Sequence, residues 1–172
     1  ALECIKRGVK VEWAQDSVLV AGGGAKGYTF PDDWMDTVRS VFPFDYPSQY
    51  REVYSMTETN AVSLRCDEGH LHPLPWGIQH VSDPETGLAL PREGVQRGRM
   101  LVMDLLASTY WSGTATGDDV TINWDGGCGC GRKGPYILNE IKRLADTRGG
   151  DDKITCAKTP QAFDRLEEYL TA

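Results

Sequence analysis

The stretch Thr116–Arg132, TGDDVTINWDGGCGCGR, decides the interpretation of the chain. Inside it, Val120, Ile122 and Trp124 alternate with polar residues, which is the period of a half-buried β-strand. Two acidic residues precede this strand, and two closely spaced cysteines follow it. We therefore predict a rigid strand with a carboxylate-bearing turn at one end and a thiol-bearing loop at the other.

Both ends of this strand carry residues suited to a functional site. Gly117 lies beside Asp118, and a glycine lets a ligand approach the backbone closely because it has no side chain. At the other end Cys128 and Cys130 flank a single glycine, and Arg132 follows. The alternative is a β-hairpin with a glycine-rich turn and two buried thiols, since short motifs also occur by chance.

The composition excludes several classes of protein. The 172 residues suffice for about one domain with a buried core. A formal charge of −7 argues against a nucleic-acid partner, because no basic stripe is available to neutralise phosphates. We find no signal peptide and no apolar run of membrane-spanning length. Five cysteines, an odd number, fit a reducing, cytoplasmic compartment and a metal site better than a disulfide framework.

The spacing of apolar residues predicts the other elements. Strands are expected at residues 9–13, 17–21, 50–53 and 99–106, and on both sides of a D-P-E-T-G turn between 81 and 91. A helix is expected after Pro31, with an acidic first turn and an apolar face made of Trp34, Val38, Val41 and Phe42. Further helices are expected at 136–145 and 161–170, with a short strand at 153–156 between them.

Two segments could contact a nucleotide. The strand at 17–21 runs into Gly22, Gly23 and Gly24 ahead of a helix, where backbone N–H groups can meet phosphates, although no Walker sequence follows and a tight turn is the alternative. The strand at 50–53 runs into Tyr54-Ser55-Met56-Thr57-Glu58. That segment combines an aromatic face, a hydroxyl and a carboxylate that can hold Mg²⁺ together with substrate phosphates.

These segments resemble the motifs of one family. Tyr54–Glu58 resembles the Y-G-x-T-E motif of adenylate-forming enzymes, the acyl/aryl-CoA synthetase superfamily, and the glycine loop is similar to that family's adenine-binding segment. Thr116-Gly117-Asp118 resembles its T-G-D motif, and Gly131-Arg132 resembles the G-R at its hinge. The closest branch is the phenylacetate-CoA ligase-like group that includes acyl-protein synthetases, on the basis of YSMTE, DPETGLALPREG, DLLASTYW and CGCGRKGP.

The resemblance implies a role for each motif. Tyr54 is expected to stack on adenine, Thr57 to touch phosphate and Glu58 to hold Mg²⁺, while Asp118 and Arg132 bind the ribose. Thr57, Glu58 and Arg132 are therefore the expected catalytic residues, and ATP and Mg²⁺ the expected cofactors.

The chain departs from the family pattern in three ways. Ser55 replaces the usual glycine, and the Ser/Thr/Gly-rich phosphate loop would lie before Ala1. Only 40 residues follow Arg132, too few for the complete C-terminal lid. We therefore expect a subunit or part of a longer protein, with residues 1–132 forming the later part of the nucleotide-binding domain and 133–172 a short tail. A companion polypeptide or an upstream segment would supply the phosphate loop.

Two groups of cysteines and histidines predict a metal site. Cys66 is followed by His70 and His72, and Cys128 and Cys130 return about sixty residues later. Zn²⁺ binds four nitrogen and sulfur ligands tetrahedrally, so one histidine with the three cysteines gives a closed structural site. A similar pattern in the phenylacetate-type ligases favours His72 over His70. The alternative is a set of scattered thiols and imidazoles with no metal.

Two further residues have open roles. Asp104 lies within the apolar strand at 99–106, either near the site or as a buried carboxylate with its own hydrogen bonds. Cys156 lies close to the C-terminus, where the acyl-protein synthetase branch carries acyl groups on a cysteine. It is either such a nucleophile or a small buried apolar residue.

Together these observations predict an α/β chain: a mixed sheet flanked by helices, with a zinc-stapled β-rich lobe at about 64–132. The expected function is part of an ATP-dependent ligase that converts an acyl or aryl carboxylic acid to acyl-AMP and passes it to a thiol acceptor. The alternative is a non-catalytic, zinc-stabilised structural subunit or domain of a larger enzyme.

Overall fold

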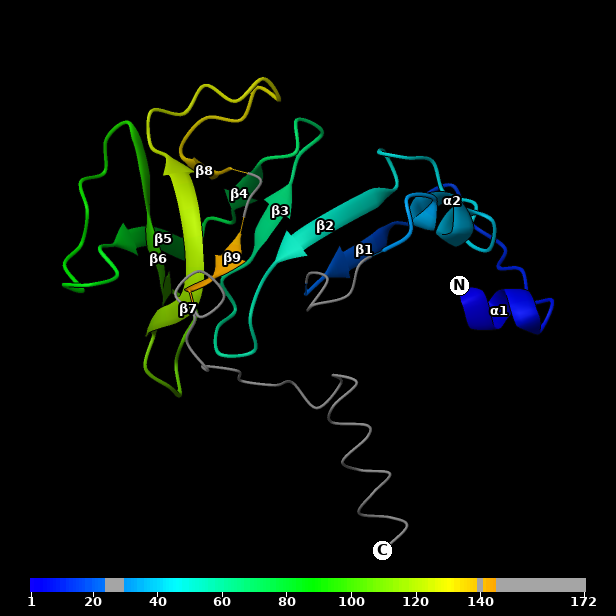
Figure 1. The fold of residues 1–172 in the computed structure, drawn as a ribbon, viewed down its shortest axis with the longest axis horizontal. Helices are drawn as coiled ribbons and strands as arrows, with labels where there is room; N and C mark the ends of the chain where they lie inside the picture. Colours follow the sequence, from blue (N-terminus) through cyan, green and yellow to red (C-terminus); the bar gives the residue numbers. More distant parts are fainter. Residues whose placement is uncertain (24–29, 139–140, 145–172) are drawn as a thin grey trace, which may run out of the picture.

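The computed structural model describes residues 1–23, 30–138 and 141–144, which form a mixed sheet with few helices (Figure 1). The helices are α1 (Leu2–Lys6) and α2 (Trp34–Arg39). The strands are β1 (Leu19–Gly22), β2 (Tyr50–Tyr54), β3 (Ser63–Arg65), β4 (Leu71–Pro73), β5 (Gly77–Ser82), β6 (Val95–Asp104), β7 (Gly113–Asn123), β8 (Tyr136–Ile137) and β9 (Lys142–Arg143). The expected strand at 153–156, the helix at 161–170, and Gly24 and Cys156 lie outside the described residues.

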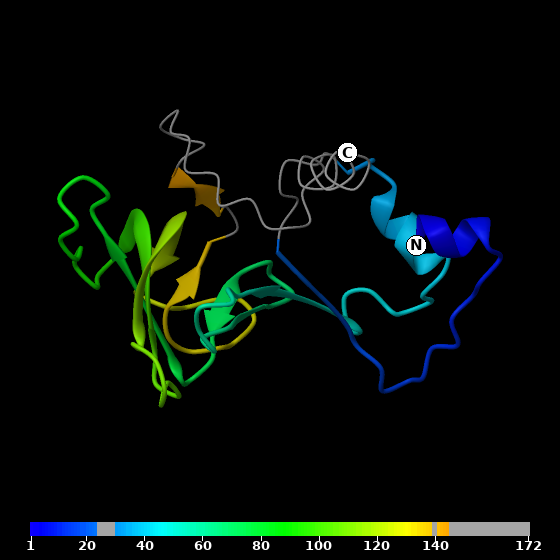
Figure 2. The ribbon, with the colours of Figure 1, turned by 90° about the horizontal axis from the view of Figure 1, so that it is seen from below.

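One nine-stranded sheet has the order β1-β2-β3-β4-β8-β7-β6-β5, with β9 paired to β7. Among the described strands, only β1 and β2 form a parallel pair; the other pairs are antiparallel. The expectation of a sheet flanked by helices is wrong for the described residues. Their two short helices lie together beyond the β1–β2 end, away from β5, β6 and β7 (Figures 1 and 2). Neither is long and apolar enough to cross a membrane.

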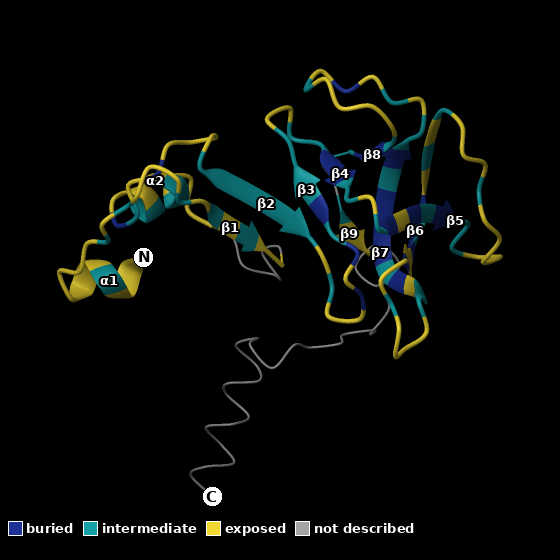
Figure 3. Ribbon diagram, turned by 180° about the vertical axis from the view of Figure 1, so that it is seen from behind, coloured by how far each residue is buried: buried dark blue, intermediate teal, exposed yellow. Residues whose placement is uncertain are grey.

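The core lies in the β-rich lobe, where strand alternation places apolar residues on one face. Val120 and Ile122 of β7 are almost fully buried, as their spacing predicted. They belong to a cluster that joins β4, β5, β6, β7 and β8 with the loop residue Ala61: Ala61, Leu71, Val81, Met100, Val102, Val120, Ile122 and Ile137. In Figure 3 the buried segments gather on β4, β5, β7 and β8, while β1 and the helices are mostly exposed or intermediate.

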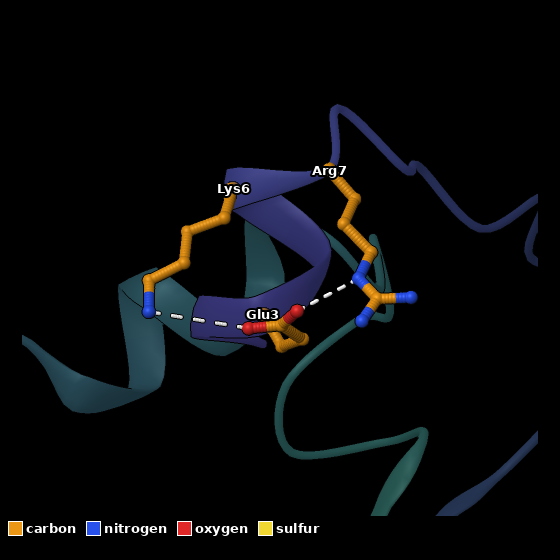
Figure 4. A network of polar contacts seen from close by, with 3 residues as sticks. All are labelled: Glu3, Lys6 and Arg7. Carbon is orange, nitrogen blue, oxygen red and sulfur yellow. Dashed lines mark hydrogen bonds and ion pairs between the residues drawn. The ribbon is translucent and has the colours of Figure 1, made fainter.

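The structure differs from the sequence prediction at two places near the N-terminus. Residues 9–13 form no strand; Trp13 instead packs its ring against Phe42 and Phe44, at centroid distances of 6.4 and 5.9 Å. The unexpected helix α1 is five residues long, and Glu3 forms ion pairs with Lys6 and Arg7 on its exposed side (Figure 4). Such i,i+3 and i,i+4 pairs add only a few tenths of a kcal/mol to helix stability. The sequence therefore gives only a weak signal for α1.

The amphipathic stretch 136–145 contains two short strands, although a single helix was expected. Tyr136 and Ile137 form β8, and Lys142 and Arg143 form β9. Ile137 pairs with Leu71 of β4 on one side and with Ile122 of β7 on the other. These ladders and the full burial of Ile137 outweigh helical periodicity, because local propensity is weak beside tertiary packing.

The predicted carboxylate turn is also different in the structure. Thr116–Asp119 lies inside the eleven-residue strand β7, so the two acidic residues are consecutive strand positions rather than a turn. Their side chains therefore point to opposite faces of the sheet. The β6–β7 register shifts between Arg99 and Leu101, where Thr116, Gly117 and Asp118 of β7 lie opposite Met100 alone.

The D-P-E-T-G turn after β5 is present. The Asp83 carboxylate accepts hydrogen bonds from the N–H groups of Glu85 and Thr86, and Gly87 adopts a φ of 72°. The chain then returns with a single bridge between Ser82 and Ala89 rather than the full second strand expected up to Pro91.

Replacing Gly98 of β6 with alanine should destabilise the fold. A Cβ at this position would lie 2.3 Å from the Ser82 carbonyl oxygen of β5, and two hydrogen-bonded strands cannot separate to accommodate it. We expect the free energy of unfolding to fall by about 1–3 kcal/mol, as for other overpacked sites, measured by urea titration. Gly117→Ala in β7 is the control, because its Cβ would meet only the end of the Arg143 side chain at 3.4 Å. Equal stability of the two variants would contradict this packing.

Candidate functional site

Three strands bring a tyrosine, a carboxylate and an arginine together. The hydroxyl of Tyr54, at the end of β2, donates a hydrogen bond of 2.7 Å to Oδ2 of Asp118 on β7. Nη1 of Arg143 on β9 lies 3.1 Å from the other oxygen, Oδ1. Asp118 is only 7% exposed, and each of its two oxygens contacts one of these neighbouring side chains.

The electrostatics keep this tyrosine protonated. Burial, the negative charge of Asp118 and the hydrogen bond to it all raise the pKa of Tyr54 well above its usual value. Tyr54 therefore remains a donor at neutral pH. The Thr116 hydroxyl accepts a hydrogen bond from the Asp118 N–H, which further orders this part of β7.

The neighbouring carboxylate has its own partner. Asp119 forms a bond of 2.8 Å with Nη2 of Arg97 on β6. Because Asp118 and Asp119 point to opposite faces, the two carboxylates that were predicted to share one turn form two separate ion pairs.

The structure places Arg143, and not Arg132, beside Asp118. Residues 142–143 pair with 118–119 in the β7–β9 ladder, which brings the Arg143 guanidinium to the carboxylate. Arg132 lies beside His72, whose pKa is lowered by burial and by the Arg132 charge. The sequence contains no local signal for the arrangement, because the partner of Asp118 is set by the pairing of a two-residue strand.

The other predicted nucleotide-binding residues lie where parallel strands end. Gly22 ends β1 and pairs with Val53, next to Tyr54, and a Cβ at Gly22 would lie 2.8 Å from Val53 Cγ2. Gly23 follows with a φ of 87°, a backbone conformation that favours glycine. The two glycines therefore lie beside the end of β2 that carries Tyr54.

Thr57 and Glu58 lie on the exposed turn that follows β2. The Thr57 hydroxyl donates to Oε2 of Glu58 at 3.2 Å. An exposed hydroxyl and carboxylate beyond a strand end are accessible to phosphate and to a cation.

Asp104 is a buried carboxylate with its own hydrogen bonds. Its oxygens accept from the backbone and side-chain nitrogens of Asn60, from the Leu106 N–H and from the Tyr110 hydroxyl. Trp76 donates to the Asn60 carbonyl, so three loops meet at this group. These donors, that of Tyr110 above all, lower the pKa of Asp104 to about 2. Asp104 therefore joins the segment after Glu58 to the end of β6.

The second group of predicted residues converges on one point. Cys66, His72, Cys128 and Cys130 offer ligand atoms that all lie within 4.8 Å of one another, and this Cys/His cluster could hold a metal ion. The Sγ atoms of Cys66 and Cys128 are 3.8 Å apart, and Cys130 Sγ is 3.4 Å from His72 Nε2. Cys66 and His72 flank the turn between β3 and β4, and Cys128 and Cys130 follow β7.

These distances fit tetrahedral zinc. With Zn–S of about 2.3 Å and Zn–N of about 2.0–2.1 Å, tetrahedral angles put two sulfurs about 3.8 Å apart and a sulfur and nitrogen about 3.6 Å apart. A soft set of three thiols and one imidazole also suits zinc better than Mg²⁺ or Ca²⁺. The residues present therefore fit this ion.

Both histidines lie close to the cluster. His70 Nδ1 is 3.2 Å from Cys128 Sγ, and its ring stacks on Tyr136 at 4.4 Å. His72 packs against the same ring at 5.6 Å, but its Nε2 is directed at Cys130. The four-residue cluster includes His72, while His70 hydrogen-bonds to one of the thiols from the side.

The thiols differ in acidity in the absence of a metal. Burial raises the pKa of Cys128 to about 11, whereas the backbone N–H of Arg132 is the main cause of a lowered pKa at Cys130. Only the thiolate is a good metal ligand.

Comparison with known proteins adds a partial resemblance. No family model and no curated protein matches the sequence. Among solved structures, the chain is similar to part of MatB from Rhodopseudomonas palustris. Its apo structure is 22% identical over 70% of this chain and 25% of MatB, with a TM-score of 0.41. For ATP-bound MatB the identity is 22%, the coverage 75% and 26%, and the TM-score 0.45.

The chain thus spans about a quarter of the length of MatB. Identity and TM-score this low carry no assignment of function. The assignments below rest on the residues of the chain itself.

The Asp104 group should make stability depend on acid pH. A lowered pKa in the folded state means that the ionised carboxylate stabilises the fold above the unfolded value near 3.8, and that this contribution is lost as pH falls toward 2. The midpoint of urea unfolding should therefore drop between pH 4 and pH 2 in the parent. Asp104→Asn should be less stable at pH 7 and should lose much of this drop. An unchanged pH profile in Asp104→Asn would contradict the assignment.

Proposed function

We propose that the chain forms part of an ATP-dependent carboxylate-activating ligase. The observation that carries the proposal is the placement of Tyr54, Asp118 and Arg143 beside the glycines that end β1. In the reaction, a carboxylate oxygen attacks the α-phosphate of ATP, the bond to pyrophosphate breaks, and acyl-AMP forms. A thiol acceptor then takes the acyl group and releases AMP. Such chemistry depends mainly on positioning and on stabilising charge.

The ribose is assigned to Asp118. A buried carboxylate that is held from two sides can accept hydrogen bonds from the two ribose hydroxyls with little loss of conformational freedom. Arg143 takes the part that the sequence assigned to Arg132, because it is the cation in contact with Asp118. The ring of Tyr54 offers its face to adenine while its hydroxyl stays bound to Asp118.

The phosphates are assigned to the exposed turn after β2. There the Thr57 hydroxyl can donate to a phosphate oxygen, and Glu58 can hold Mg²⁺, which would neutralise charge on the phosphates when bound. The backbone of Gly22 and Gly23 would approach the adenine side. A phosphate-binding loop comes from an upstream segment or a companion polypeptide in this proposal, and the carboxylic acid substrate binds where that part meets this chain.

The Cys/His cluster is assigned to structural zinc. The ion would join the turn between β3 and β4 to the loop after β7 through Cys66, His72, Cys128 and Cys130. Four protein ligands close the coordination shell, so the ion would supply stability rather than a site for water or substrate.

A structural role for the whole chain is the second candidate. It is favoured by one observation: the Cys/His cluster is complete within the described residues, whereas the nucleotide site needs a phosphate loop from elsewhere. In that case the chain would be a non-catalytic, zinc-stabilised part of a larger enzyme.

Removing a metal ligand should release the ion and destabilise the fold. We expect about one zinc per chain in protein purified without chelators, and Cys128→Ser or Cys66→Ser should lose it because the remaining ligands cannot close the tetrahedron. Metal analysis and thermal unfolding test this, with Cys4→Ser as the matched control, since Cys4 lies in α1 outside the cluster. Zinc-free protein in which the cluster thiols titrate readily in the folded state would contradict the proposal.

Changing Asp118 should weaken nucleotide binding. Asp118→Asn keeps the shape of the side chain but removes its charge, and we expect AMP and ATP to bind about 1–3 kcal/mol more weakly, the cost of losing a charged hydrogen-bond partner. Arg143→Gln should weaken binding in the same direction. Arg97→Gln is the control, because Arg97 pairs with Asp119 instead.

The measurement is calorimetric titration of the chain together with the part that carries the phosphate loop. If Asp118→Asn binds AMP as the parent does, the ribose assignment is wrong. If Arg97→Gln and Arg143→Gln weaken AMP binding equally, the loss comes from the lower overall positive charge and not from the contact with Asp118.

A further inference from the structure

A cavity of about 480 Å³, broadly open to solvent, lies beside the Cys/His cluster and has no part in the proposed nucleotide site. Its size falls in the range of about 300–1,000 Å³ typical of small-molecule sites. Most of its wall is apolar, contributed by Leu64, Pro73, Leu74, Pro75, Gly77 and Pro135. The polar part of the wall consists of His72, Arg132 and Lys133. An apolar cavity with a few converging polar groups is the usual composition of a ligand pocket.

The two cations are available to a ligand. Arg132 and Lys133 are exposed and follow Gly131, whose φ of 81° turns the chain directly after Cys130. Within the described part of the chain, neither side chain forms an ion pair with a carboxylate. Two adjacent unpaired cations are notable in a protein with a net charge of −7. The Cys/His cluster fixes the loop that carries them, because Cys130 is only two residues away.

The strand register places Leu64 and His72 of this cavity on the face of the sheet opposite Tyr54. Tyr54 pairs with Ser63, whereas Leu64 pairs with Val53 and with His72. Successive residues of a strand point to opposite faces. Tyr54 and its partner Asp118 therefore lie on one face of the sheet, and Leu64 and His72 lie on the other.

We propose that this cavity binds a small phosphate monoester with an apolar body. A phosphate monoester carries close to two negative charges at neutral pH, which matches the two cations, and the guanidinium fork of Arg132 suits phosphate geometry. The proline and leucine wall would cover the apolar body. His72 cannot bind the phosphate through Nε2 when that atom is a metal ligand. Arg132 and Lys133 therefore bind the phosphate.

The probe is phenyl phosphate, titrated calorimetrically into the full zinc-loaded chain. We expect saturable binding at one site, at least about tenfold tighter than inorganic phosphate, which lacks the apolar body, and than benzyl alcohol, which lacks the charge. Arg132→Gln and Lys133→Gln should each weaken phenyl phosphate binding about tenfold. Arg39→Gln is the control, since Arg39 is a cation in α2. Zinc content and thermal unfolding of each variant show that the cluster is intact.

Three results would overturn the proposal: no saturable binding of phenyl phosphate, equal binding of inorganic phosphate, or equal losses in Arg132→Gln and Arg39→Gln. Benzoate tests the charge requirement, and it should bind more weakly because it carries one negative charge. Equal or tighter binding of benzoate would make the cavity a carboxylate site and would contradict the phosphate assignment.

The test is independent of the proposed nucleotide site. Phenyl phosphate binding should be unchanged in Asp118→Asn, and AMP binding should be unchanged in Arg132→Gln. Loss of AMP binding in Arg132→Gln with none in Asp118→Asn would place the nucleotide in this cavity and would overturn both assignments. If phenyl phosphate alone fails to bind, the conclusion about AMP binding at Asp118 is unaffected.

Discussion

The convergence of Cys66, His72, Cys128 and Cys130 is the contact on which the middle of the sheet depends. β3, β4 and β8 are only two or three residues long, and strands of this length bury little surface and form few hydrogen bonds. Thiol and imidazole groups drawn from both sides of this region lie at the spacing of a tetrahedral zinc site. A metal ion there would replace the cohesion that longer strands would otherwise provide, as it does in other small metal-stabilised domains.

The second constraint is the sharing of one carboxylate. Asp118 is bound by Tyr54 from β2 and by Arg143 from β9, so two strands at different places in the sheet meet at one buried charge. A buried carboxylate without such partners would be costly. The same partners hold the carboxylate in one orientation, as the proposed ribose contact requires.

The two faces of the sheet separate these features. Tyr54 and Asp118 occupy the face that also carries the core residues Ile122 and Val120, while His72 and Leu64 lie on the other. A single chain of this size therefore presents two chemically different regions, an acidic and aromatic one and a thiol-rich one bordered by cations. Their separation follows from strand alternation alone.

The sequence by itself determined the elements with strong local patterns and the residues with distinctive chemistry. The spacing of Val120 and Ile122 predicted the buried face of β7, and the paired Cys/His groups predicted the cluster that the fold assembles. Only the tertiary structure decided that residues 136–137 and 142–143 form strands, that Thr116–Asp119 continues β7, and that Arg143 rather than Arg132 meets Asp118. In each case strand pairing between distant residues overrides a weak local preference, because hydrogen bonds and burial gained across the sheet exceed the small energies of helix periodicity and turn propensity.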